Sequence, residues 1–180
     1  QMGIIVQEVV GKRVGKYYLP AFAGVAFSNN EFRWSPRIKK DDGLVRLVPG
    51  LGTRAVDRIG DDYPILVAPG MPGLSVNITT EEIIKYSPKK IDVINLESNY
   101  FQTIDIKELI KESGNDYPYA DKVFSVYKND DISKSYFVDY QEEYNDTVVT
   151  FSSLIKNTSF VKDIHIILNT LKKSLGYPID

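Results

Sequence analysis

Short apolar runs with polar interruptions recur along the chain and predict a series of β-strands. Several of these runs follow one another too closely for a helix to connect them, which favours antiparallel pairing. We therefore expect an α+β fold, a mainly antiparallel sheet with packed helices. The runs 4–10, 22–28 and 44–48 are expected to share one sheet. The full set of predicted strands covers residues 4–10, 22–28, 44–48, 91–96, 122–127, 135–140 and 147–154.

Three stretches carry helix signals. Thr79 and Glu82 form a capping box that opens a short helix ending before Pro88. Asp105 caps a second helix that ends near Gly114. The third helix, at residues 160–175, places Lys172 and Lys173 on its outer side, and its apolar face is expected to pack on the sheet. That face consists of Phe160, Ile164, Ile167, Leu168, Leu171 and Leu175.

Composition excludes several classes of site. The 180-residue chain has 43% hydrophobic and 26% charged residues, as in ordinary globular proteins. A net charge of −2 argues against a nucleic-acid surface, and no apolar run has the length of a membrane span. With no cysteine and one histidine, His165, zinc sites built on thiolates or several imidazoles are excluded. We expect a cytoplasmic protein with no nucleic-acid or membrane partner.

The run 44–48 leads into a glycine loop, which we define as residues 50–54. Gly50 and Gly52 allow a tight turn that brings backbone N–H groups close to a ligand. Thr53 is a candidate helix N-cap, and Arg54 is suited to bidentate phosphate binding. On local pattern alone, a plain strand-to-helix turn with solvated arginines is the alternative that we favour. Nearby, Asp61 and Asp62 are paired acids, for which a solvated turn is favoured over a metal site.

Four short pieces, in order, carry a resemblance to a known family. They are Gln7-Glu8-Val9-Val10, Ala23-Gly24-Val25-Ala26-Phe27-Ser28, Gly50-Leu51-Gly52 and Gly176-Tyr177-Pro178-Ile179-Asp180. Together they resemble the N-terminal nucleotide-binding domain of phosphoenolpyruvate synthase and pyruvate phosphate dikinase, which the rifampin phosphotransferases share. The resemblance implies an ATP-grasp fold and the binding of ATP with Mg²⁺.

The resemblance also implies roles for individual residues. The backbone at Gln7, Glu8 and Val9 would meet the adenine, and Gly24 would lie beneath the nucleotide. Gly50 and Gly52 would lie near the ribose and phosphates, beside Thr53 and Arg54. Asp180 would be the first acid of an acidic pair that holds the metal–nucleotide complex, since Mg²⁺ prefers hard oxygen ligands alongside phosphates.

The chain departs from the family pattern in places. Thr53 stands where the family has glutamate, and Asn29-Asn30-Glu31 replaces an Arg-Asn-Pro segment. The family's second acid and its Gln-x-Arg strand would follow Asp180, and its lysine-bearing subdomain would precede Gln1. We therefore expect residues 1–180 to be a partial ATP-grasp domain, truncated at both ends.

The expected parent is an ATP-dependent phosphotransferase of the kinase or dikinase type. In the family that the chain resembles, this domain works with a swivelling phosphohistidine domain and a phosphoenolpyruvate/pyruvate-binding domain. Two alternatives stay open: a related antibiotic or glucan phosphotransferase, and a degenerate, non-catalytic nucleotide-sensing or scaffolding module. No catalytic residue is assigned within the chain, because His165 lies in an ordinary amphipathic helix. The fragment alone is expected to bind ATP weakly and to be inactive.

Overall fold

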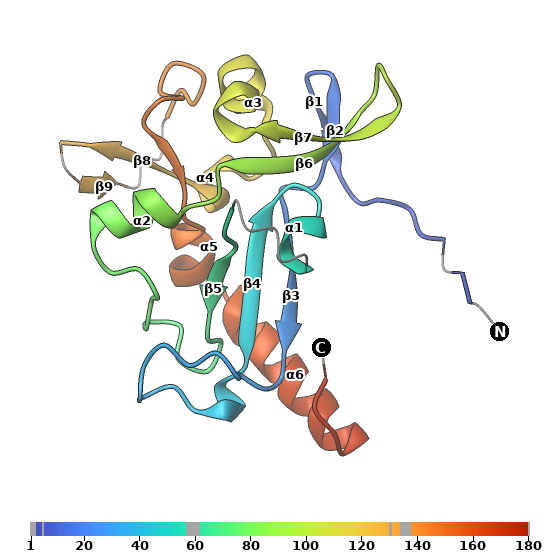
Figure 1. Cartoon of the computed structure of the whole chain (residues 1–180), viewed down its shortest axis with the longest axis vertical. Coiled ribbons are helices and arrows are strands. Elements are labelled where there is room, and N and C mark those ends of the chain that lie inside the picture. Colours follow the sequence, from blue (N-terminus) through green and yellow to red (C-terminus); the bar gives the residue numbers. More distant parts are fainter. Residues whose placement is uncertain (1–2, 5, 57–61, 130, 134–137, 180) are drawn as a thin grey trace.

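Three antiparallel sheets with helices packed against them make up the described part of the chain, a computed structural model (Figure 1). The structure describes residues 3–4, 6–56, 62–129, 131–133 and 138–179. Every paired strand among them is antiparallel, which confirms the predicted α+β fold. None of the helices in these ranges combines the length and apolar character that crossing a bilayer requires.

The central sheet has the strand order β3-β4-β5, and the glycine loop follows β4. Strands β3 (Phe22–Phe27) and β4 (Leu44–Pro49) pair along their whole length, from Phe22 opposite Pro49 to Phe27 opposite Leu44. Strand β5 (Ile65–Val67) pairs with the other edge of β4. The pairing of 22–28 with 44–48 is as predicted, and the short 3₁₀ helix η1 (Lys40–Asp42) precedes β4.

A four-stranded sheet, ordered β1-β2-β6-β7, lies across the end of β4 (Figure 1). It consists of β1 (Lys12–Val14), β2 (Tyr17–Leu19), β6 (Lys90–Asn95) and β7 (Tyr100–Asp105). The predicted strand 91–96 is thus β6, paired on both sides.

The predicted strand at 4–10 is wrong. The described residues of this run form no strand, and Ile4, Val6 and Val10 are 79%, 91% and 82% exposed. Pairing of β1 with β2 ends at Lys12 opposite Leu19, and the next residue on that side is Pro20, which has no N–H to donate. The β-branched composition of the run could not reveal that its partner strand ends there.

The third sheet, β10-β8-β9, corrects the predictions for two runs, and a third run lies only partly within the described residues. The run 122–127 begins as helix α4 (Ala120–Val123) and becomes strand β8 (Phe124–Lys128) only afterwards. The run 147–154 is strand β10 (Thr147–Val149) followed by helix α5 (Ser152–Asn157), because Phe151 takes a left-handed conformation that ends the strand. Residues 135–137 of the predicted strand 135–140 lie outside the described residues, and 138–140 form no strand. The third strand is instead β9 (Asp131–Ser133).

The capped helices form as predicted. Helix α2 (Thr80–Tyr86) begins with the capping box, in which Thr79 Oγ1 accepts from the Glu82 amide at 3.2 Å. Helix α3 (Ile106–Ser113) begins at Asp105, whose carboxylate accepts from the Lys107 amide at 2.7 Å. The one-turn 3₁₀ helix η2 (Gly114–Asp116) follows.

Helix α6 (Phe160–Leu175) packs on β3 as predicted, but with a shorter apolar contact. Phe160 meets Phe22 edge-to-face at 5.5 Å, and Leu168 is buried, whereas Ile167 and Leu171 are exposed. The second half of the helix runs past the end of β3 (Figure 1), so no strand covers it there. The periodicity of the helix predicted its apolar face, but it could not show where the sheet beneath that face ends.

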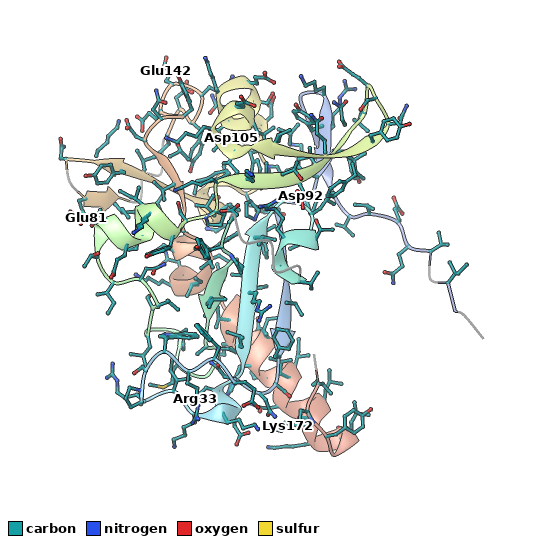
Figure 2. All side chains as sticks on the ribbon, in the orientation of Figure 1. Arg33, Glu81, Asp92, Asp105, Glu142 and Lys172 are labelled. Atoms are coloured by element: carbon teal, nitrogen blue, oxygen red, sulfur yellow. The ribbon has the colours of Figure 1, made fainter. Side chains whose placement is uncertain are left out.

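Lys172 was predicted to point to solvent, but it contacts other parts of the protein instead. Its ammonium group donates to Asn29 Oδ1 and to Asp41 Oδ1, both at 2.7 Å. These contacts tie α6 to the loops that flank β3 and β4. Figure 2 shows Lys172 near the bottom of the molecule, far from Asp92 in its upper half.

The hydrophobic core lies between the three sheets and helices α3 and α6. Tyr117 is buried within it and donates to the carbonyl of Ala21 at 2.5 Å, which joins η2 to the start of β3. Burial raises the pKa of Tyr117, and a hydrogen bond with the Gly50 backbone acts in the opposite direction. The largest fully buried apolar side chains are Leu19, Ile38, Leu47, Ile91, Leu109, Ile110 and Phe151.

Candidate functional site

The glycine loop turns at the junction of the central and four-stranded sheets. Gly50 follows the last residue of β4 and has a φ of +70°, the left-handed region that favours glycine. A Cβ at Gly50 would lie 2.5 Å from Ile91 Cγ1 and 2.6 Å from the Asp92 carbonyl oxygen. Both conformation and space therefore require glycine at position 50.

The tight turn predicted for Gly50 and Gly52 does not depend on both glycines in the same way. Its φ is not in the left-handed region, and a Cβ there would meet only the Ala23 Cβ, at 3.2 Å. The positive φ that a tight turn requires lies at Gly50 instead. Helix α1 (Thr53–Val56) begins at Thr53, so Gly52, not Thr53, is the residue that precedes it.

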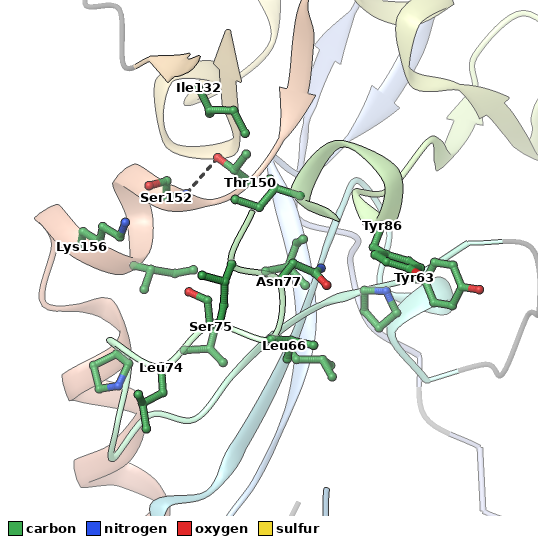
Figure 3. Close-up of a pocket in the computed structure, with 18 of the residues that line it drawn as sticks. Tyr63, Leu66, Leu74, Ser75, Asn77, Tyr86, Ile132, Thr150, Ser152 and Lys156 are labelled. Carbon is green, nitrogen blue, oxygen red and sulfur yellow. Dashed lines mark hydrogen bonds between the residues drawn. The ribbon is translucent and has the colours of Figure 1, made fainter. Parts of the chain in front are cut away.

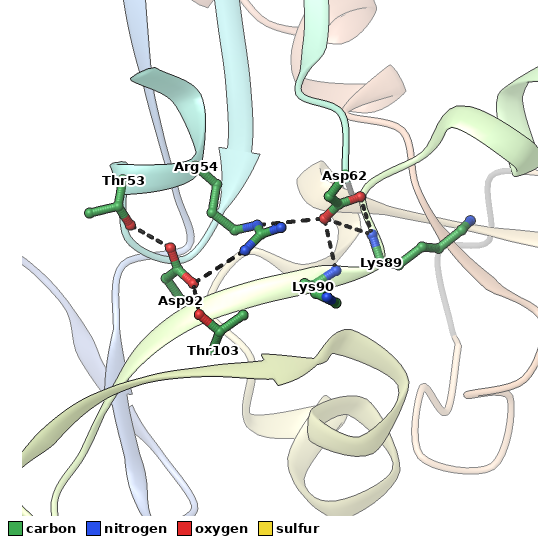
Figure 4. A network of polar contacts seen from close by, with 7 residues as sticks. All are labelled: Thr53, Arg54, Asp62, Lys89, Lys90, Asp92 and Thr103. Atoms are coloured by element: carbon green, nitrogen blue, oxygen red, sulfur yellow. Dashed lines mark hydrogen bonds and ion pairs between the residues drawn. The ribbon is translucent and has the colours of Figure 1, made fainter. Parts of the chain in front are cut away.

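Asp92 on β6 holds the loop (Figure 4). Its carbonyl oxygen accepts from the Leu51 amide at 3.0 Å, and Gly50 and Asp92 form a parallel bridge. Its carboxylate accepts from Thr53 Oγ1 at 2.5 Å and from Thr103 Oγ1 at 2.7 Å. Asp92 is 1% exposed, so this carboxylate is satisfied entirely within the protein.

Arg54 points inward. It is 8% exposed, with Nη1 3.8 Å from Asp92 Oδ1 and Nε 3.6 Å from Asp62 Oδ2 (Figure 4). The void beside Arg54 and Asp62 measures about 10 Å³, which is close to the space of one water. A phosphate group cannot enter it. Arg54 reaches a phosphate only if it leaves these two carboxylates.

Asp62 is not in the solvated turn that the sequence favoured. Its carboxylate accepts from the Lys89 amide at 3.0 Å and from the Lys90 amide at 3.0 Å, and its side chain is 6% exposed. Asp61 lies outside the described residues. The pair of acids therefore includes one buried structural carboxylate, which fixes the segment before β5 to the start of β6.

Sequence reasoning missed Asp62, Asp92 and Thr103 as partners of the loop. One signal for Asp92 was available: a carboxylate between Ile91 and Val93 in an otherwise apolar strand must be exposed or paired. Its partners are not visible in the sequence, because Thr53 is 39 residues away.

The adenine-binding segment predicted at Gln7, Glu8 and Val9 is exposed and lies outside every sheet. The Val9 carbonyl accepts from the Tyr18 hydroxyl at 3.1 Å, which places the segment beside β2. Figure 1 shows the chain before β1 leading away from the body of the molecule. The structure does not bring this segment to the glycine loop.

Gly24 lies on β3 opposite Leu47. A Cβ at this position would clash with the carbonyl oxygen of Arg46 on β4. The neighbouring strand therefore already requires a glycine here, whether or not a nucleotide lies over it.

Asp180, the predicted metal ligand, lies outside the described residues. The preceding Ile179 exchanges hydrogen bonds with Ser28: its amide donates to Ser28 Oγ at 2.9 Å and its carbonyl accepts from the Ser28 amide at 2.8 Å. Ser28 directly follows β3, whereas the glycine loop lies beside the start of that strand. Ile179 and the glycine loop are thus separated by the length of β3, about 20 Å at 3.3 Å per residue.

The described residues include no cluster of three or more histidine, cysteine or acidic side chains able to hold a metal. His165 is half-buried and its Nε2 lies 3.0 Å from Asn169 Nδ2 within α6, in keeping with a structural position.

A separate cavity of about 590 Å³ lies between β5, the segment before α2, β9 and α5 (Figure 3). Its wall is mainly apolar, with Tyr63 and Tyr86 in edge-to-face contact at 5.6 Å. Thr150, Ser152 and Lys156 supply polar groups on one side. None of the described residues predicted to bind nucleotide lines this cavity.

Comparison with known proteins identifies the family. The chain has no significant match among curated proteins or among solved structures. A family model described as the pyruvate phosphate dikinase AMP/ATP-binding domain matches residues 1–180, and this family has an ATP-grasp-type fold. The predicted resemblance is thereby confirmed. The chain belongs to the AMP/ATP-binding domain family of pyruvate phosphate dikinase, the nucleotide-binding part of a dikinase-type enzyme.

Proposed function

We propose that this chain supplies part of the ATP cleft of an ATP-dependent phosphotransferase resembling phosphoenolpyruvate synthase. The observation that carries the proposal is the glycine loop, turned through left-handed Gly50 and fixed between two sheets. A backbone loop that is already ordered loses little entropy when a phosphate binds to its amides. Family membership makes an adenine nucleotide the ligand to test first.

The amides of Gly52 and Thr53 are the proposed phosphate contacts. The Leu51 amide is engaged by the Asp92 carbonyl, and Arg54 is held by two carboxylates. Gly52 has no side chain to hinder the approach of a phosphate to these amides. The hydroxyl of Thr53, at the position of the family's glutamate, donates to Asp92 and not toward a ligand.

The adenine is proposed to meet the backbone of Gln7, Glu8 and Val9, with Gly24 beneath the nucleotide. Exposure of the whole segment supports this, because it leaves backbone groups accessible to a ligand. The segment must move toward the central sheet to reach a nucleotide at the glycine loop. Asp180 remains the proposed Mg²⁺ ligand, together with the nucleotide phosphates.

The proposed partners are the swivelling phosphohistidine domain and the phosphoenolpyruvate/pyruvate-binding domain of the parent chain. The role of this chain would be to orient the nucleotide and hold its phosphates, because phosphoryl transfer depends mainly on positioning and charge stabilisation. An antibiotic or a glucan as the final acceptor is compatible with the same nucleotide site.

One observation favours a second function, that of a non-catalytic nucleotide-sensing or scaffolding module. Thr53 and Arg54, which both belong to the divergent part of the loop, make buried contacts within the protein. A loop whose polar side chains all serve the fold would bind nucleotide weakly or not at all.

Calorimetric titration of Mg-ATP distinguishes these functions. The full-length enzyme is expected to bind tightly, the 180-residue chain weakly, and the full-length Gly52→Val variant about tenfold or more weakly, because its β-branched side chain blocks approach to the loop amides. Gly73→Val is the control, since a Cβ at Gly73 has no neighbour within 4 Å.

Unchanged affinity in Gly52→Val would make the loop a plain strand-to-helix turn. Tight binding to the 180-residue chain would contradict the proposal that it forms only part of the cleft. A full-length protein that lacks phosphotransfer would favour the scaffolding module.

A further inference from the structure

One buried residue, Asp92, contacts most of the glycine loop through its backbone and its side chain. Asp92 binds the Leu51 amide through its carbonyl oxygen, Thr53 through Oδ2 and Arg54 through Oδ1. It is itself 1% exposed, so it cannot touch a ligand in the surrounding solvent. Any effect of Asp92 on a nucleotide must therefore pass through the loop.

The geometry points to Asp92 as the positioning residue of the glycine loop for nucleotide binding. This inference rests on the proposed function, in which the amides of Gly52 and Thr53 contact phosphate. Those two residues lie between Leu51 and Arg54, which Asp92 holds through its backbone and its carboxylate. Fixing both ends of so short a segment fixes the direction of the amides between them.

Asp62 fixes the same segment from the other side. It accepts from the amides of Lys89 and Lys90 at the start of β6 and lies 3.6 Å from Arg54 Nε. Arg54 is thus held between two carboxylates that are both anchored to β6 (Figure 4). The loop cannot slide along β6 without separating Arg54 from one of them, which is costly for buried charges.

Thr103 offers a way to test Asp92 without touching the loop. It faces Asp92 across β6 and β7 in the strand register, and its hydroxyl donates to Asp92 Oδ1 at 2.7 Å. In Figure 4 it lies on the opposite side of Asp92 from Thr53. Loss of this hydroxyl leaves Oδ1 with Arg54, 3.8 Å away, so the carboxylate and the attached loop must readjust.

The experiment measures the Mg-ATP dissociation constant and the melting temperature of the full-length enzyme and its variants. Thr103→Val, which is nearly isosteric, is expected to weaken binding about threefold or more, because the loop amides lose their fixed direction when Asp92 loses this hydrogen bond. Thr103→Ser keeps the hydroxyl and is expected to bind within about twofold of wild type. Asp92→Asn, which removes the charge facing Arg54, is expected to weaken binding about tenfold or more.

Ser125→Ala is the control for stability alone. Ser125 is buried in the third sheet and its hydroxyl lies 2.6 Å from Thr150 Oγ1. This variant is expected to lower the melting temperature about as much as Thr103→Val while leaving the dissociation constant unchanged.

Three results have distinct meanings. Weaker binding in Thr103→Val, restored in Thr103→Ser and absent in Ser125→Ala, supports the positioning role. Wild-type affinity in both Thr103→Val and Asp92→Asn overturns that role and leaves the proposed function standing. No binding of Mg-ATP by the wild-type enzyme overturns the proposed function and the positioning role together.

Discussion

Gly50 is constrained both by its positive φ and by close neighbours, whereas Gly176 is constrained by its positive φ alone. Gly50→Ala is expected to destabilise the protein by about 2–4 kcal/mol, because it adds left-handed strain to a clash with Ile91 and Asp92. Gly176→Ala, at a φ of +78° but with no neighbour within 4 Å, is expected to cost only about 1 kcal/mol. Urea denaturation measures both. Equal losses would show that the packing of Gly50 against β6 contributes nothing.

The ion pairs of Arg54 differ from those at the surface. Arg54→Met leaves the buried carboxylates of Asp62 and Asp92 without their cation, which is expected to cost about 3–5 kcal/mol. Lys40→Met breaks an exposed pair with Glu31 and is expected to change the free energy of unfolding far less, because solvent and salt screen that pair. The comparison uses chemical denaturation at neutral pH. A small effect of Arg54→Met would mean that water reaches the network.

Single residues were predictable from sequence where their partners are local. The capping roles of Thr79 and Asp105 depend on residues within one turn of each helix, and both are confirmed. The contacts of Asp62, Asp92 and Arg54 depend on residues brought together only by the packing of two sheets. Side-chain chemistry showed that Arg54 could bind an anion, but not that the anion would be a carboxylate of the same chain.

Helix α6 changes from buried to exposed along its length. Leu168→Ala, at a side chain that is 7% exposed, is expected to destabilise the protein by about 2–5 kcal/mol. Leu171→Ala, at 44% exposure, is expected to cost less than about 1 kcal/mol. Thermal and urea unfolding of the two variants test this difference. If the whole apolar face of α6 were packed on the sheet, both variants would lose a similar amount of stability.

The contact between Lys172 and Asp41 predicts a dependence on pH. The hydrogen bond from Lys172 lowers the pKa of the Asp41 carboxyl below its unfolded value near 3.8. Its stabilisation is therefore complete above that value and is lost as the pH falls through the lower, folded pKa. The stability difference between wild type and Lys172→Met should shrink on acidification below about pH 4. A difference that is constant from pH 7 to pH 2 would contradict this contact.

Helices and strands were predictable where the sequence pattern of the element itself determines its structure. Strands β3, β4 and β6 and the three capped or amphipathic helices form near the predicted positions. The run 4–10 has equally strong β propensity but no strand to pair with beyond Pro20. Strand propensity is realised only when a partner edge is available, and a single sequence does not show that edge.

At the scale of the molecule, α+β architecture followed from the short spacing between strands, whereas the division into separate sheets did not. The glycine loop lies where two of these sheets meet, so its environment is a property of tertiary packing. The large apolar cavity lies elsewhere, between β5, α2, β9 and α5, and shares no described residue with the loop. We propose that the nucleotide binds at the loop and not in this cavity.

Hydrogen–deuterium exchange of the proposed parent enzyme, with and without Mg-ATP, tests this proposal most directly. Nucleotide is expected to slow exchange at the amides of residues 50–55 and of Gln7, Glu8 and Val9. The segment 74–78 and helix α5, which line the cavity, should exchange at unchanged rates. Protection confined to those cavity residues, with none at the glycine loop, would contradict the account.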